Sequence, residues 1–160
     1  MLRLDPDYAG KAATVSGLAK DITEYLGTLD LPPIERNGLT VAYHSACSMQ
    51  HGQKITMLPK TLLKRAGFTV RDPAEGHLCC GSAGTYNIMQ PEISAQLKAR
   101  KVKNIEATRA DIIATGNIGC ITQLASGTAM PILHTVELLD WAYGGTKPVK
   151  LEALKEKRAV

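Results

Sequence analysis

Two spacings of apolar residues alternate along the chain. Runs of consecutive apolar residues predict buried strands, whereas apolar residues three or four positions apart predict helices. We expect strands at 39–44, 68–70, 111–114 and 130–134, and helices at about 54–66, 90–108, 121–126 and 135–143. Such alternation is typical of a parallel sheet covered by helices. The sequence therefore predicts an α/β fold: a single three-layer domain with a four-stranded, mainly parallel, Rossmann-like sheet and an N-terminal helix.

The residues before the first strand carry their own helical pattern. Val15, Leu18, Ile22 and Leu26 recur at helical spacing, which predicts a helix from Tyr8 to Tyr25. Two consecutive prolines at 32 and 33 end this pattern. We expect a helical lead-in over 1–36, an α/β domain over 37–145 and a charged tail over 146–160.

Composition excludes several classes of function. Aromatic residues make up 4% of the chain, too few for a surface that stacks single-stranded nucleic acid. No apolar stretch approaches the ~20 residues of a membrane span, and no hydrophobic leader follows Met1. The net charge of the chain is +4, and we expect the basic residues to lie on the solvated surface. They include a basic face of the helix 90–108, formed by Lys98, Arg100, Lys101 and Lys103. We expect a cytoplasmic protein, in which clustered cysteines bind metal or catalyse rather than form disulfides.

Each cysteine follows a predicted strand. Cys47 comes after the first strand, the pair Cys79-Cys80 after the second, and Cys120 after the third, while His134 ends the fourth. Because the carboxyl ends of parallel strands lie at one edge of a sheet, we expect all four thiols to meet there. Four thiols are a ligand set that both zinc and iron–sulfur clusters accept.

The residues around the paired cysteines fit a metal site. Adjacent thiols rarely bond to each other, but they can share one soft metal centre. Gly81 and Gly84 allow the backbone to approach that centre and to donate N–H groups to sulfur. Weaker candidates for the site are His44, His134 and Gln123. Taken singly, Cys47 or Cys120 is read equally well as a small core residue, and a cysteine nucleophile assisted by His44 or His77 lacks any recognisable orienting group.

Three cysteine blocks and their neighbours carry a resemblance to a known family. They are Tyr43-His44-Ser45-Ala46-Cys47, His77-Leu78-Cys79-Cys80-Gly81-Ser82-Ala83-Gly84 and Thr115-Gly116-Asn117-Ile118-Gly119-Cys120, followed by His134-Thr135-Val136-Glu137. Over roughly 1–145 the chain resembles the cysteine-rich CCG domain. That domain occurs in heterodisulfide reductase, in lactate-utilisation proteins and in the iron–sulfur subunit of bacterial glycolate oxidase; the flanking residues point to the last.

The resemblance implies an iron–sulfur cluster held by Cys47, Cys79, Cys80 and Cys120, either of the ordinary 4Fe-4S type or non-cubane, the latter needing a fifth thiolate. It implies electron transfer from a partner flavin subunit of a glycolate oxidase complex that oxidises a 2-hydroxy acid. The family motif ends in Cys-x-x-Cys, and here Gln123 stands at its last position. A zinc-binding or metal-free docking module, and a heterodisulfide reductase-like thiol/disulfide site, therefore remain as alternatives.

The resemblance also implies partners beyond this sequence. Relatives of this kind carry an upstream ferredoxin-like region with Cys-x-x-Cys-x-x-Cys blocks, which this sequence lacks. We therefore expect a C-terminal domain of a longer chain, inactive by itself and associated peripherally with the inner membrane through its complex.

Overall fold

The computed structural model describes residues 2–35, 38–152 and 154. The chain divides into two compact units, Met1–Leu31 and Pro32–Val160. The last residues of the predicted charged tail, 155–160, lie outside the described residues. Within the described part of the chain, no helix is long and apolar enough to cross a membrane.

The first unit contains η1 (Leu2–Leu4), α1 (Ala9–Leu18) and α2 (Ile22–Leu26). The prediction of one helix from Tyr8 to Tyr25 is wrong, because the chain becomes extended at Asp21, where a new helix begins. The Asp21 carboxylate accepts a hydrogen bond from the Thr23 N–H, and the Glu24 carboxylate accepts one from the Asp21 N–H, each at 2.8 Å. This reciprocal capping starts α2 independently of α1.

The second unit is built on a four-stranded sheet with the strand order β2-β1-β3-β4. Its strands are β1 (Thr40–Tyr43), β2 (Thr69–Arg71), β3 (Ile112–Thr115) and β4 (Ile132–His134). Every pairing is parallel, with Val41 opposite Ile112 and Ile113 opposite Ile132. The α/β prediction is therefore confirmed, and the sheet is parallel throughout.

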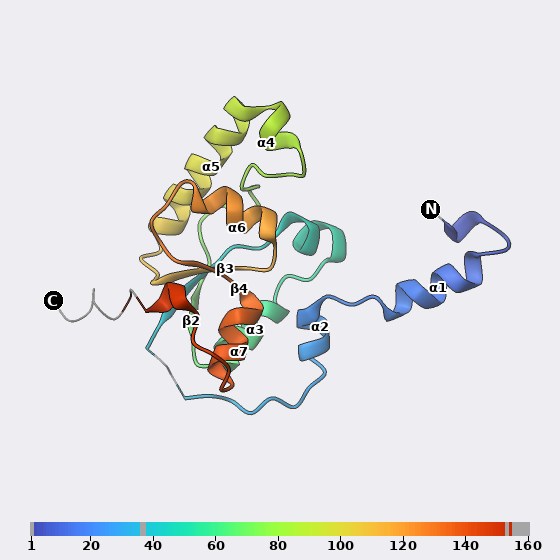
Figure 1. Ribbon diagram of the computed structural model, residues 1–160, viewed down its shortest axis with the longest axis horizontal. Helices are drawn as coiled ribbons and strands as arrows, with labels where there is room; N and C mark the ends of the chain where they lie inside the picture. Colours follow the sequence, from blue (N-terminus) through green and yellow to red (C-terminus); the bar gives the residue numbers. More distant parts are fainter. Residues whose placement is uncertain (1, 36–37, 153, 155–160) are drawn as a thin grey trace. The chain divides into compact units, whose positions relative to one another are not determined.

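Helices cover both faces of this sheet. Figure 1 shows α5 (Pro91–Glu106) and α6 (Ile118–Ala125) on one side, with α3 (Leu58–Arg65) and α7 (Thr135–Ala142) on the other. The shorter segments are η2 (Ser48–Gln53), α4 (Tyr86–Met89) and η3 (Val149–Leu151). Because both faces are covered, the central strands are apolar without alternation: Val41, Ala42, Ile112 and Ile113 are all fully buried.

Several helix ends differ from the predicted positions, for identifiable reasons. Helix α3 begins at Leu58 rather than 54, because Pro59 fits only the first turn. Helix α7 is capped by His134, not Thr135: the imidazole accepts from the Val136 N–H at 3.2 Å. Helix α6 begins at Ile118 rather than 121, because the Asn117 side chain accepts from the Cys120 N–H at 3.2 Å. Cys120 therefore lies in the first helical turn and not in a loop.

Candidate metal centre

The four cysteines line one cavity of about 350 Å³ at the carboxyl edge of the sheet. Cys47 follows β1, Cys79 and Cys80 lie between β2 and α4, and Cys120 opens α6 after β3. The strand order reverses between β1 and β3, since β1 leads to β2 on one side and the later strands lie on the other. Crevices at such reversals are where open α/β sheets place their ligands.

The cavity has a buried half and an outer half. Cys80 and Cys120 are buried, with their Sγ atoms in hydrogen-bond contact at 3.4 Å. Cys47 and Cys79 are half-buried, and Cys79 Sγ accepts a hydrogen bond from the Gly81 N–H at 3.3 Å. All four cysteines are free thiols. The cavity therefore offers four sulfur donors, two of them buried and two half-buried.

Contacts between the thiols shift their pKa values in opposite directions. The hydrogen bond with Cys120 lowers the pKa of Cys80 to about 4 despite its burial, and the nearby His44 and the Ser82 backbone act in the same direction. The same hydrogen bond, together with burial, raises the pKa of Cys120 above its usual range. Burial and the neighbouring Cys79 raise the pKa of Cys47 to about 11. The buried pair thus holds one proton at neutral pH, leaving one thiolate.

These pKa values predict how the thiolate absorbance of the metal-free protein changes with pH. A group whose folded pKa is depressed stays ionised until the pH falls through that value, so the Cys80 thiolate should persist at pH 7 and be lost near pH 4. Cys47 should ionise only near pH 11. Ultraviolet absorbance titration measures both steps. The Cys80→Ser variant should lack the acid step, and absence of any thiolate below pH 8 in the unsubstituted protein would contradict the assignment.

The glycine after the cysteine pair is held against α5. Gly81 has a φ of +92°, and a Cβ added there would lie 2.5 Å from the Ser94 carbonyl oxygen. The buried Ser94 hydroxyl donates to the Gly81 carbonyl at 2.9 Å and accepts from the Gln123 Nε2 at 2.8 Å. This chain of hydrogen bonds fixes the loop that carries Cys79 and Cys80.

The weaker ligand candidates that the sequence indicates lie in different surroundings in the structure. Gln123 is occupied at both ends of its amide, by Ser94 and by the Asn87 Nδ2 at 3.4 Å. His134 serves as the cap of α7. Gly84 lines the cavity with a φ of +63°. His44 lies beside the buried pair: one of its ring nitrogens and the sulfurs of Cys80 and Cys120 all lie within 4.8 Å of one another.

Sequence reasoning missed one charged residue at the site. The prediction that Lys101 belongs to an exposed basic face is wrong: its side chain is 0% exposed. Its ammonium donates to the Glu75 carbonyl at 2.7 Å and the Gly76 carbonyl at 3.4 Å. Burial lowers the pKa of Lys101, and the thiolate forms of Cys47 and Cys80 oppose that shift. A detectable signal existed, since Lys101 stands seven residues after the buried Ser94 and four before the buried Ile105.

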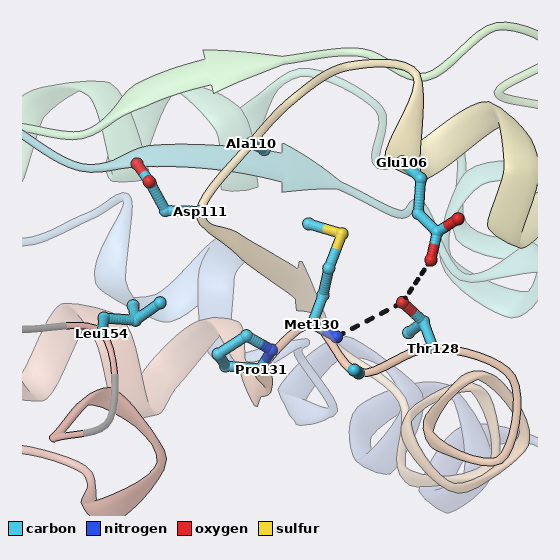
Figure 2. Close-up of a pocket in the computed structure, with 8 residues that line it drawn as sticks. Glu106, Ala110, Asp111, Thr128, Met130, Pro131 and Leu154 are labelled. Carbon is cyan, nitrogen blue, oxygen red and sulfur yellow. Dashed lines mark hydrogen bonds between the residues drawn. The ribbon is translucent and has the colours of Figure 1, made fainter. Parts of the chain in front are cut away.

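A second pocket, of about 340 Å³, lies at the opposite edge of the sheet, near the start of β3 and β4 (Figure 2). Its polar side chains are engaged. The Thr128 hydroxyl donates to the Glu106 carboxylate at 2.7 Å, and the Asp111 carboxylate accepts from the Thr40 N–H at 2.8 Å. Among the described residues that line this pocket there is no cysteine or histidine. The thiols are therefore confined to the carboxyl edge, and the sulfur at this pocket is the Met130 thioether.

A parallel α/β sheet with cysteines gathered at its carboxyl edge defines a class of cysteine-rich domains. The family model of the cysteine-rich domain named CCG matches residues 41–125, and the chain belongs to this family. The matched segment runs from β1 to the last residue of α6, so it contains every cysteine of the chain.

Curated relatives extend the similarity beyond that segment. The chain is 40% identical over 143 residues to the glycolate oxidase iron-sulfur subunit of Escherichia coli K12, covering 89% of this chain and 35% of that protein. It is 30% identical to the probable glycolate oxidase iron-sulfur subunit of Bacillus subtilis, covering 79% of this chain and 30% of that protein. It is 27% identical to lactate utilization protein A of Shouchella clausii, covering 85% of this chain and 60% of that protein. The chain thus spans about a third of the length of the first two relatives.

Proposed function

We propose that this chain is the cluster-binding domain of the iron–sulfur subunit of a glycolate-oxidising complex. The observation that carries the proposal is the convergence of all four cysteines on one cavity, in a chain 40% identical to a glycolate oxidase iron-sulfur subunit. In this proposal Cys47, Cys79, Cys80 and Cys120 hold a 4Fe-4S cluster. A flavin-containing partner subunit supplies electrons from a 2-hydroxy acid, and a ferredoxin-like region of the parent chain passes them on.

The donor set fits such a cluster. Thiolate sulfur is the usual ligand of iron–sulfur clusters, and the buried Cys80 is already poised as a thiolate by its contact with Cys120. The buried ammonium of Lys101 lies near enough to lower the pKa of Cys47, so it offsets part of the negative charge of such a site. When bound, an iron–sulfur cluster accepts and releases single electrons.

The protein's own residues have distinct tasks in this proposal. The Gly81 N–H donates to Cys79 Sγ, and hydrogen bonds to sulfur raise or lower a cluster's reduction potential. The Ser94–Gln123 pair keeps Gly81 in place. The isolated domain would have no turnover of its own, because the 2-hydroxy acid is oxidised at the flavin. We place the complex in the cytoplasm, peripheral to the inner membrane.

One observation favours a second candidate, a zinc-binding docking module. The Cys80 and Cys120 sulfurs are 3.4 Å apart, close to the ~3.7 Å between two thiolates on one tetrahedral ion with Zn–S bonds of about 2.3 Å. Metal analysis of anaerobically purified protein separates the two. Iron and sulfide support the first proposal, whereas stoichiometric zinc in a colourless protein supports the second.

The electron-carrying role is tested in the assembled complex. Under anaerobic conditions, glycolate should reduce the cluster of this domain when the flavin subunit is present, giving an EPR signal that an added acceptor removes. A Cys80→Ser variant should lose that signal while the flavin is still reduced by glycolate. Reduction of an added disulfide, and not of a simple acceptor, would instead support a heterodisulfide reductase-like site.

A further inference from the structure

His44 is a buried histidine whose ring nitrogens form no hydrogen bond of normal geometry with the described residues, although the ring lies beside the Cys80 thiol. It follows β1 directly, and its backbone N–H donates to the Ala114 carbonyl at 2.8 Å, which fixes its position beside β3. The side chain is 1% exposed, and among the described residues neither Nδ1 nor Nε2 has a partner. A buried polar group left unpaired costs about 1–3 kcal/mol. Such a group in a native fold calls for an explanation, and an absent ion is one of the usual ones.

The imidazole lies beside two sulfur donors. One His44 ring nitrogen and the Sγ atoms of Cys80 and Cys120 all lie within 4.8 Å of one another, and all three residues are buried. Donors around one tetrahedral ion, with bonds of about 2.0–2.3 Å, stand roughly 3.3–3.8 Å apart. The two sulfurs already have this spacing, at 3.4 Å. Small side-chain rotations would therefore bring all three donors onto one ion.

The other candidates for an additional ligand are occupied. The Gln123 amide bonds with Ser94 and Asn87. The His134 Nδ1 accepts from the Val136 N–H. His44 is the candidate with both ring nitrogens available, and it is the one that faces the buried sulfurs.

We propose that His44 is a metal ligand, with one ring nitrogen binding the same metal centre as Cys80 and Cys120. The site is then a mixed nitrogen and sulfur site at its buried end, and the pair of cysteines releases its remaining proton as the metal binds. The inference is made for a single soft divalent ion, because each iron of a 4Fe-4S cluster takes one protein ligand and four cysteines already supply all of them. It shares its cysteines with the proposed function, but the ligand assignment does not depend on that function.

Cobalt(II) alone, added anaerobically to the metal-free chain, is the probe. We expect one ion per chain with the visible bands of a tetrahedral site. In His44→Leu the affinity should fall by more than about 100-fold, beyond the about 10–100-fold lost when a residue that only supports a ligand is removed. The visible bands should also shift. His51→Ala is the matched control, since His51 is exposed in η2, and it should bind cobalt as the unsubstituted chain does.

Unchanged cobalt affinity in His44→Leu would overturn the inference, as would a loss of 10–100-fold with unchanged bands, which marks a supporting residue. Misfolding is checked by denaturant unfolding of the metal-free proteins. Because leucine removes the unpaired nitrogens at similar volume, His44→Leu should be at least as stable as the unsubstituted chain. A parallel incubation with iron and sulfide separates this inference from the proposed function. If no cluster forms but cobalt binding needs His44, only the proposed function fails.

Discussion

Replacing Gly81 with alanine is expected to lower the free energy of unfolding by about 2–5 kcal/mol. The new Cβ would lie 2.5 Å from the backbone oxygen of Ser94, which belongs to α5 and cannot rotate away. The φ of +92° adds strain for any residue with a side chain. Because the Gly81 N–H donates to Cys79 Sγ, the displaced loop should also weaken metal binding. Urea unfolding measures the first effect and metal titration the second.

Gly84→Ala is the matched control for this substitution. Gly84 also has a positive φ, of +63°, but an added Cβ would meet nothing within 4 Å. Only the conformational cost remains, so we expect a loss of about 1 kcal/mol. Equal losses in the two variants would mean that contact with α5 does not confine Gly81.

Replacing Lys101 with methionine is expected to make the site less favourable for negative charge. Methionine has a similar length and suits a buried position, but it removes the ammonium and its two hydrogen bonds to the Glu75 and Gly76 carbonyls. The pKa of Cys47, which Lys101 lowers, should rise. In the cluster-loaded protein the same loss of positive charge should make the reduction potential more negative.

The matched control for Lys101→Met lies two residues further along α5. Lys103 is exposed, so Lys103→Met should leave both the thiol pKa and the potential within error. Redox titration followed by EPR measures the potential, and thiol absorbance measures the pKa. An equal shift in the two variants would show that net charge, rather than the buried ammonium, is responsible.

The convergence of the cysteines could be predicted from the sequence because it depends on topology alone. Cys47, Cys80 and Cys120 each follow a different strand, and parallel strands bring their carboxyl ends to one edge. Which thiols are buried could not be predicted from the sequence, because their burial depends on how α6 packs. Asn117 starts that helix early enough to bury Cys120 against Cys80.

Other features of the structure have weaker signals in the sequence, or none. The Asp21-x-x-Glu24 spacing is that of a capping box, and it could have located the break between α1 and α2. The charge of Lys101 predicts a surface position, although its spacing from Ser94 and Ile105 matches the buried face of α5. The lack of a hydrogen-bond partner for the His44 ring has no sequence signal, because it depends on how side chains distant in the sequence pack around the ring.

The most direct test of the metal centre is anaerobic reconstitution of the chain with iron and sulfide, followed by metal analysis and EPR. We predict iron and sulfide in a fixed ratio and a reducible cluster in the unsubstituted protein, both lost in Cys80→Ser with the fold retained by circular dichroism. Absence of a cluster under every reconstitution condition, in a protein with an intact fold, would contradict the account.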